Sequence, residues 1–126
     1  KEFKLEVLPL KVTIKGKEYQ NLLDESEISS KVFYDMLREK ETAITAQANP
    51  ADFLQVMKPI LASWRDVLSI SFSSALSGTY NSSVIATKEL LEEFPDRKII
   101  TIDSLCASMG QGLLLTYAAR KQQSGK

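Results

Sequence analysis

The sequence predicts an α/β fold in which a mostly parallel sheet has helices on both faces and a short β-hairpin lies near the N-terminus. Short apolar runs rich in Val and Ile alternate along the chain with longer segments of helical periodicity. The helical segments are long enough to connect parallel strands by right-handed crossovers. The 126 residues, 44% of them hydrophobic, suffice for one compact core, so we expect residues 1–126 to form a single domain.

The N-terminal third is predicted to begin with the hairpin. Residues 7–14 have the composition of a strand, Lys15-Gly16-Lys17 is typical of a turn, and residues 18–20 form a short return strand. Ser29 is a candidate N-cap for the helix that follows. We interpret residues 39–48 as a polar connection.

The rest of the chain is predicted to alternate helix and strand. Asn49-Pro50 indicates a helix start, because Asn caps the first turn and Pro fits its first position. Strands are predicted at residues 67–72 and 98–103, joined by a helix that ends near Phe94. A last helix covers about residues 108–122.

Two hydroxyl-rich segments follow the predicted strands, where ligands of parallel α/β sheets collect. We call residues 73–79 (SSALSGT) the Ser loop and residues 103–108 (DSLCAS) the Asp loop. In the Ser loop, hydroxyls stand beside Gly78 just ahead of a helix, whose N-terminal amides and positive end favour an anion. Taken singly, each of these serines is better explained as a cap or turn residue. The loop as a whole, with four hydroxyls and a glycine, fits both interpretations equally. Asp103 is interpreted as a cap or loop-fixing acid that can also position a ligand.

The composition argues against several classes of function. Lys plus Arg and Asp plus Glu both number 16, so the chain lacks the basic surplus that is typical of nucleic-acid-binding domains. It has no histidine, which removes the usual general base and the standard serine-hydrolase triad. One cysteine excludes a thiolate zinc cluster, and the sequence patterns of P-loops, dinucleotide-binding loops and nucleophile elbows are absent. We therefore predict no catalytic residue, no metal site and no cofactor.

The expected location is cytoplasmic. Cys106 is the single cysteine, so no internal disulfide can form, and no export signal is recognised. No apolar run approaches the roughly 20 residues that cross a bilayer, so no membrane span is predicted. The chain begins on a strand-like stretch without Met, so we expect it to be part of a longer protein.

Three further residues are interpreted as packing residues. Gly110 and Gly112 lie inside a helical pattern, where each costs about 1 kcal/mol relative to Ala, and close backbone packing would explain them. Trp64 is interpreted as a packing residue at the end of its helix.

Four ordered stretches resemble the DegV family of bacterial fatty-acid-binding proteins: residues 8–12, 16–19, 71–82 and 102–112. The resemblance implies two α/β domains, of which this chain is similar to the N-terminal, lipid-binding one. It also implies a buried acyl chain whose carboxylate is held by hydroxyls, and for some members a separate fatty acid kinase as partner. The family's usual first strand, with its Asp-Ser-Thr motif, and its second domain are absent from this sequence.

The resemblance implies a carboxylate-binding role for four residues. Thr45 falls on the first residue of the family's Thr-Ser-Gln-Pro-Ser-Pro stretch, in which Ala46 and Ala48 here replace a serine and a proline. Ser74, Ser77 and Gly78 belong to the family's Ser-Ser-x-Leu-Ser-Gly-Thr loop, which is intact. Asp103 and Ser104 form a possible second contact.

Three hypotheses about function stay open. The leading one is a non-enzymatic fatty-acid-binding domain, which the resemblance implies. The second is an enzyme that transfers or hydrolyses a phosphate or acyl group at the Ser loop, with a lysine or carboxylate as base. The third is a structural module that forms homodimers through an exposed sheet edge and apolar surface.

Overall fold

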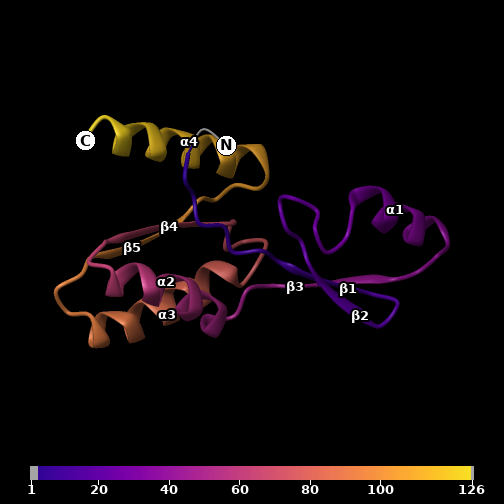
Figure 1. Cartoon of the computed structure of the whole chain (residues 1–126), viewed down its shortest axis with the longest axis horizontal. Coiled ribbons are helices and arrows are strands. Elements are labelled where there is room, and N and C mark those ends of the chain that lie inside the picture. The colour runs from indigo at the N-terminus through magenta and orange to yellow at the C-terminus, as the bar shows by residue number, and fades with distance from the viewer. Residues whose placement is uncertain (1–2, 126) are drawn as a thin grey trace. The chain divides into compact units, whose positions relative to one another are not determined.

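The computed structural model describes residues 3–125, whose contacts divide the chain into two compact units. One unit is residues 7–48, and the other is residues 49–125 with the short segment up to Glu6. Helices and strands alternate in the unit of residues 49–125, whereas the unit of residues 7–48 begins with two consecutive strands (Figure 1). The single domain expected for residues 1–126 stays a prediction.

An antiparallel sheet of order β2-β1-β3 is the framework of the unit of residues 7–48. β1 (Lys11–Ile14) pairs with β2 (Lys17–Gln20) across a two-residue turn, and the predicted hairpin is confirmed. Lys15 and Gly16 have φ angles of 52° and 72°, the positive values that match a tight turn to the twist of its strands. The Ser29 hydroxyl accepts a hydrogen bond from Val32 N at 3.2 Å, so Ser29 is the N-cap of α1 (Ser30–Arg38), as predicted.

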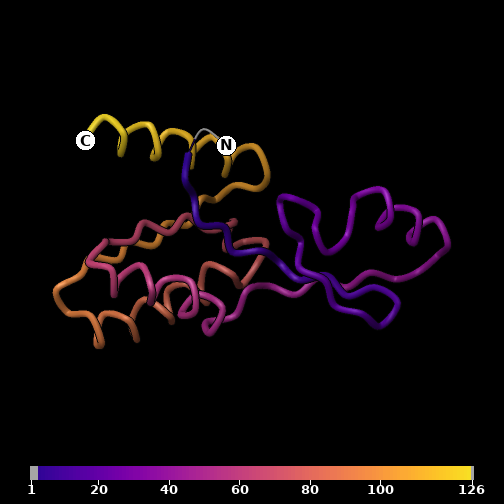
Figure 2. Tube along the Cα trace, viewed as in Figure 1, coloured from indigo at the N-terminus to yellow at the C-terminus, as the bar shows by residue number. Residues whose placement is uncertain are grey.

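A third strand lies within residues 39–48, so their interpretation as a polar connection is wrong for β3 (Ala43–Ala46). β3 pairs antiparallel with β1, and its course can be followed in Figure 2. Two of its four residues are Ala, a weak strand former, so the partner edge of β1 rather than local preference creates the strand. The pairing also explains why β1 begins at Lys11 instead of residue 7, because both of its neighbours end opposite Lys11.

A parallel pair of strands between helices forms the unit of residues 49–125. β4 (Val67–Ser71) and β5 (Ile99–Asp103) are in register from Val67–Ile99 to Ser71–Asp103, and α3 (Thr79–Glu93) connects them. Figure 1 shows α2 (Pro50–Ala62) and α3 on one side of the strands and α4 (Met109–Gln123) on the other. The predicted α/β class is confirmed. In residues 3–125, the helices lack the length and apolar character that a bilayer crossing requires.

α2 starts where the sequence predicts. Asn49 Oδ1 accepts from Asp52 N at 3.0 Å and Asp52 Oδ2 accepts from Asn49 N at 2.9 Å, which completes a capping box ahead of Pro50. The helix ends at Ala62, and Trp64 then takes the left-handed φ of 62° that turns the chain towards β4. Its side chain is 76% exposed, so the prediction that Trp64 is a packing residue is wrong.

The core between α2 and α3 combines large aliphatic residues with small polar ones. Leu61 and Leu90 are 2% and 0% exposed. The buried face of α3 is otherwise made of small side chains: Thr79, Ser82, Ser83, Ala86 and Thr87. Small residues on a helix face let its backbone lie close to its neighbours, and α3 contacts α2, β4 and β5.

Replacement of Leu90 by Ala tests this core. We expect the free energy of unfolding to fall by about 2–5 kcal/mol, because the substitution removes buried methyl groups and leaves a cavity. Leu91→Ala is the matched control, since its side chain is 38% exposed on the same helix. Urea unfolding followed by circular dichroism measures both variants, and equal losses would contradict the assignment of Leu90 to the core.

Candidate functional site

The Ser loop and the Asp loop meet at the carboxyl ends of β4 and β5. These ends lie at the same edge because the strands are parallel. Two hydrogen bonds join the loops: Ser73 N donates to Cys106 O at 3.0 Å, and Ser74 N donates to Asp103 Oδ1 at 3.1 Å. A third, from Ser104 N to Ser71 O at 3.1 Å, joins the Asp loop to the end of β4. The two loops therefore form one connected surface.

Asp103 is the charged centre of this connection. Its Oδ1 also accepts from Leu105 N at 3.0 Å. Hydrogen bonds from the Ser74 side chain, and then from the backbone of Leu105 and Ser74, hold the pKa of Asp103 below its ordinary value, against a smaller opposing effect of desolvation. Asp103 is thus an ionised, loop-fixing acid, one of the two roles that the sequence suggests.

Ser104 has its hydroxyl turned into its own loop. Its Oγ donates to Cys106 O at 3.1 Å and accepts from Cys106 N at 3.2 Å, and the residue is 6% exposed. One donor and one acceptor function of the hydroxyl are used in this way. Ser104 accordingly shapes the Asp loop.

Ser77 and Gly78 lie at the N-terminus of α3. Ser77 Oγ is 2.9 Å from Thr79 Oγ1 and accepts from Thr79 N at 3.2 Å, while Thr79 is 9% exposed and Ser77 is half-buried. Gly78 is the N-cap residue, and none of the residues in the first turn is acidic. The positive end of the helix dipole is therefore not neutralised by the helix's own first turn.

Sequence reasoning gave no separate role to Ser71, although it ends β4. Its Oγ is buried without a hydrogen-bond partner among residues 3–125, and the residue is 4% exposed. Ser71 and Asp103 are register partners, so their side chains leave the same face of the sheet. The available signal was a hydroxyl at the last residue of a predicted strand, directly before the Ser loop.

The structure places the predicted site residues in two groups. Ser74, Ser77 and Gly78 lie together with the Asp loop in the unit of residues 49–125. Thr45 lies on β3, opposite Val12, in the unit of residues 7–48, and it is exposed. A clamp that combines Thr45 with the Ser loop stays a prediction.

α4 begins directly after the Asp loop, and the two glycines in its first turn differ. A Cβ on Gly110 would lie 2.9 Å from Cβ and 3.0 Å from Sγ of Cys106, so the predicted close packing is confirmed there. A Cβ on Gly112 would meet no atom within 4 Å outside its immediate helix surroundings, so the same prediction is wrong for Gly112. Gln111 Nε2 donates to Ile70 O at 3.1 Å and ties α4 to β4.

Comparisons with known proteins identify the family and agree with the fold. The family model described as "uncharacterised protein, DegV family" matches residues 1–126. A DegV domain-containing protein of Clostridium perfringens is 42% identical over 126 residues, which are all of this chain and 43% of that protein. A solved structure of a stearic acid-binding protein from Eubacterium ventriosum has a TM-score of 0.82 at 25% identity. The match covers 94% of this chain and 40% of the chain of that protein. A DegV family protein from Thermus thermophilus, solved for its fatty acid binding, has a TM-score of 0.80 at 31% identity with the same coverage. The chain thus spans less than half the length of the proteins that it matches.

The ionisation of Asp103 predicts a pH dependence of the loops. Because the pKa is lower in the folded chain than the ordinary value of about 3.9, the stabilising contribution of Asp103 is complete above that value. It is lost as the pH falls through the folded pKa. We expect the amide protons of Ser74 and Leu105 to shift together with a midpoint below about 3.9 in NMR spectra. The amide of Ala86, inside α3, is the internal control, and a common midpoint at or above the ordinary value would contradict the proposed bonding.

The two glycines predict opposite effects on stability. Gly110→Ala is expected to lower the free energy of unfolding by about 1–3 kcal/mol, because its Cβ overlaps Cys106. Gly112→Ala has the room for a methyl group and is expected to raise it by up to about 1 kcal/mol. Thermal unfolding of the two variants provides the comparison, and a stabilised Gly110→Ala variant would show that the Asp loop does not pack on α4 as described.

Proposed function

We propose that this chain, which belongs to the DegV family, is the part of a fatty-acid-binding protein that holds the ligand's carboxylate at the Ser loop. The observation that carries the proposal is the hydroxyl pair of Ser77 and Thr79 at an N-terminus whose first turn contains no acid. The solved relatives that bind fatty acids support the ligand class.

The hydroxyl pair suits a carboxylate because it can act as a relay. When the buried Thr79 hydroxyl donates to Ser77 Oγ, the Ser77 hydroxyl is available to donate outward. A carboxylate oxygen accepting from Ser77 would also lie at the positive end of α3. Hydrogen bonds to a charged group contribute about 1.5–3 kcal/mol, and a donor that is itself hydrogen-bonded is polarised further.

The negative charge of Asp103 limits where the ligand's carboxylate lies. Two carboxylates repel each other at short range, so the ligand group belongs on the Ser77–Gly78 side of the loop. Ser74 contributes its side chain to Asp103 and, like Ser104, holds the loops in place. The buried Ser71 hydroxyl, which has no partner among residues 3–125, is a further donor on the same face of the sheet as Asp103.

Apolar side chains beside the hydroxyls favour a fatty acid over a small polar anion. Leu76 of the Ser loop is 67% exposed and Leu105 of the Asp loop is 75% exposed. An acyl chain that covers such groups gains about 0.8 kcal/mol per buried CH₂. Inorganic phosphate would leave them in water.

Thr45 and the partners are the parts of the proposal that rest on family resemblance. Thr45 would supply a second hydroxyl to the same carboxylate. A separate fatty acid kinase would then receive the bound ligand in the cytoplasm, with this chain as its non-catalytic subunit. Homodimerisation is a separate possibility that light scattering over a concentration series decides.

A catalytic role at the Ser loop is the alternative, and the charge state of Asp103 argues against it. Asp103 is the carboxylate that the two loops supply, and its lowered pKa makes it a weak general base. Turnover of an acyl ester or phosphoester by the purified protein, lost in Ser77→Ala, would establish the enzyme and overturn the binding-only proposal.

Removal of both proposed hydroxyls tests the carboxylate site. In a protein of full family length that carries this chain, Ser77→Ala with Thr45→Ala is expected to weaken fatty acid binding by about ten-fold or more, since each lost bond to the carboxylate is worth about 1.5–3 kcal/mol. Fluorescence displacement of a bound fatty acid probe measures the dissociation constant.

The control removes a hydroxyl outside the loops. Thr116 Oγ1 donates to Gly112 O within α4, so Thr116→Ala is expected to leave fatty acid affinity unchanged. Unchanged affinity in the double variant would rule out the proposed site. Organic extraction and mass spectrometry of the purified chain show in parallel whether a fatty acid is retained by these 126 residues.

A further inference from the structure

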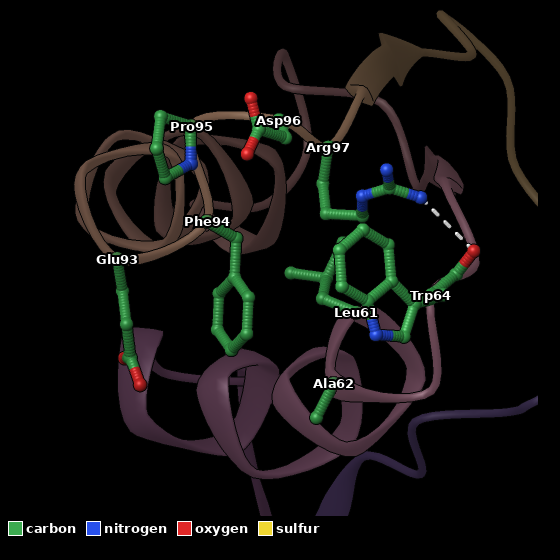
Figure 3. A pocket seen from close by; sticks show the side chains of 8 residues that line it. All are labelled: Leu61, Ala62, Trp64, Glu93, Phe94, Pro95, Asp96 and Arg97. Atoms are coloured by element: carbon green, nitrogen blue, oxygen red, sulfur yellow. Dashed lines mark hydrogen bonds between the residues drawn. The ribbon is translucent and has the colours of Figure 1, made fainter.

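A recess lies within the unit of residues 49–125, at the opposite end of the β4–β5 pair from the Ser loop and the Asp loop. It has a volume of about 180 Å³. Its apolar walls include Leu61, Trp64, Phe94 and Pro95, and the carboxylates of Glu93 and Asp96 stand beside them (Figure 3). We call this recess the Trp64 pocket.

Trp64 is held facing outward. Its φ of 62° lies in the left-handed region that bulky residues rarely adopt, and such strained positions concentrate at functional sites. The guanidinium of Arg97 lies 4.7 Å from the centre of the indole ring, and its Nη1 donates to Trp64 O at 3.0 Å, as Figure 3 shows. Trp64 is 76% exposed, so its ring lines the pocket from outside the core.

The size of the pocket restricts its occupant. Pockets for small molecules and cofactors have volumes of about 300–1,000 Å³, which exceed this one. A single apolar side chain fits the volume better. Trp and Arg are also among the residues that contribute most to protein–protein interfaces, and both line this pocket.

The charges around the pocket indicate what accompanies that side chain. Glu93 pairs with Lys58 at 2.7 Å, and Arg97 is engaged by Trp64 and lies 3.9 Å from Asp66. Asp96 is exposed and forms no hydrogen bond or ion pair within residues 3–125. The charge left without a partner at the rim is thus negative.

We propose that the Trp64 pocket is a docking site for a partner protein that inserts one apolar side chain flanked by Lys or Arg. The site lies at the strands' amino ends, whereas the Ser loop lies at their carboxyl ends, so a docked partner leaves the Ser loop open. The proposal is independent of the ligand that the Ser loop binds.

The single tryptophan of the chain makes the test direct, because its indole N–H gives one reporter signal inside the pocket. Two capped synthetic pentapeptides serve as probes: Ala-Arg-Leu-Lys-Ala and the charge-reversed Ala-Glu-Leu-Glu-Ala. In ¹H–¹⁵N spectra of the whole chain, we expect the indole and the Arg97 amide to shift saturably with the basic peptide at low-millimolar concentrations. Binding of the acidic peptide is expected to be about five-fold weaker or more, because its charges meet Asp96.

Substitutions at two positions distinguish peptide binding in the Trp64 pocket from nonspecific binding. Asp96→Lys is expected to abolish the preference for the basic peptide, whereas Glu89→Lys, the same charge change outside the pocket, keeps it. Trp64→Gly suits the left-handed backbone and retains the dispersion of the other amide signals, but the Arg97 amide no longer responds to peptide.

Each remaining outcome overturns the proposal. An indole signal that does not move, or that moves equally with both peptides, excludes a basic apolar partner. A signal that shifts with protein concentration alone assigns the pocket to a second copy of the chain. Peptide binding that survives Trp64→Gly places the contact elsewhere.

Discussion

The Ser loop and the Asp loop are joined through one acceptor atom, Oδ1 of Asp103. Ser74 and Asp103 lie 29 residues apart in the sequence. Ser74 N and Leu105 N both donate to this oxygen, so the carboxylate fixes the start of the Ser loop and the turn of the Asp loop together. A hydrogen bond from the Ser74 side chain, together with these backbone bonds, lowers the pKa of Asp103 and keeps it ionised. In the proposed site, the charge of Asp103 would place the ligand's carboxylate on the α3 side, so Asp103 would constrain the ligand without contacting it.

The character of the site follows from the way its polar groups are used. The Ser104 hydroxyl bonds within the Asp loop, and the Ser74 side chain bonds to Asp103. The Ser77 hydroxyl is instead paired with that of Thr79 at the positive end of α3. Donors are thus arranged around a place for negative charge, and exposed leucines stand next to it. Such an arrangement suits the amphipathic anion proposed above, and the lowered pKa of Asp103, the carboxylate of the two loops, makes it a weak general base.

The elements that local patterns specify could be predicted from the sequence. Periodicity indicates β4, α3 and β5, capping chemistry locates Ser29 and Asn49, and parallel pairing implies that the Ser and Asp loops share an edge. β3 could not be predicted in this way, because its Ala-rich segment becomes a strand only through its distant partner β1. The exposed Trp64 contacts Arg97, which is distant in the sequence, and the hydrogen bonds of the Ser104 hydroxyl require the folded loop. Neither feature can be predicted from the local sequence pattern.

The small side chains on the inner face of α3 limit which substitutions this fold can accept in evolution. Ser83 and Ala86 are fully buried, and Thr87 is almost so, with its Oγ1 unpartnered among residues 3–125. Size therefore limits exchange at these positions, because an added carbon must displace a neighbouring element. Natural variation along this face should therefore stay within a narrow range of side-chain volumes.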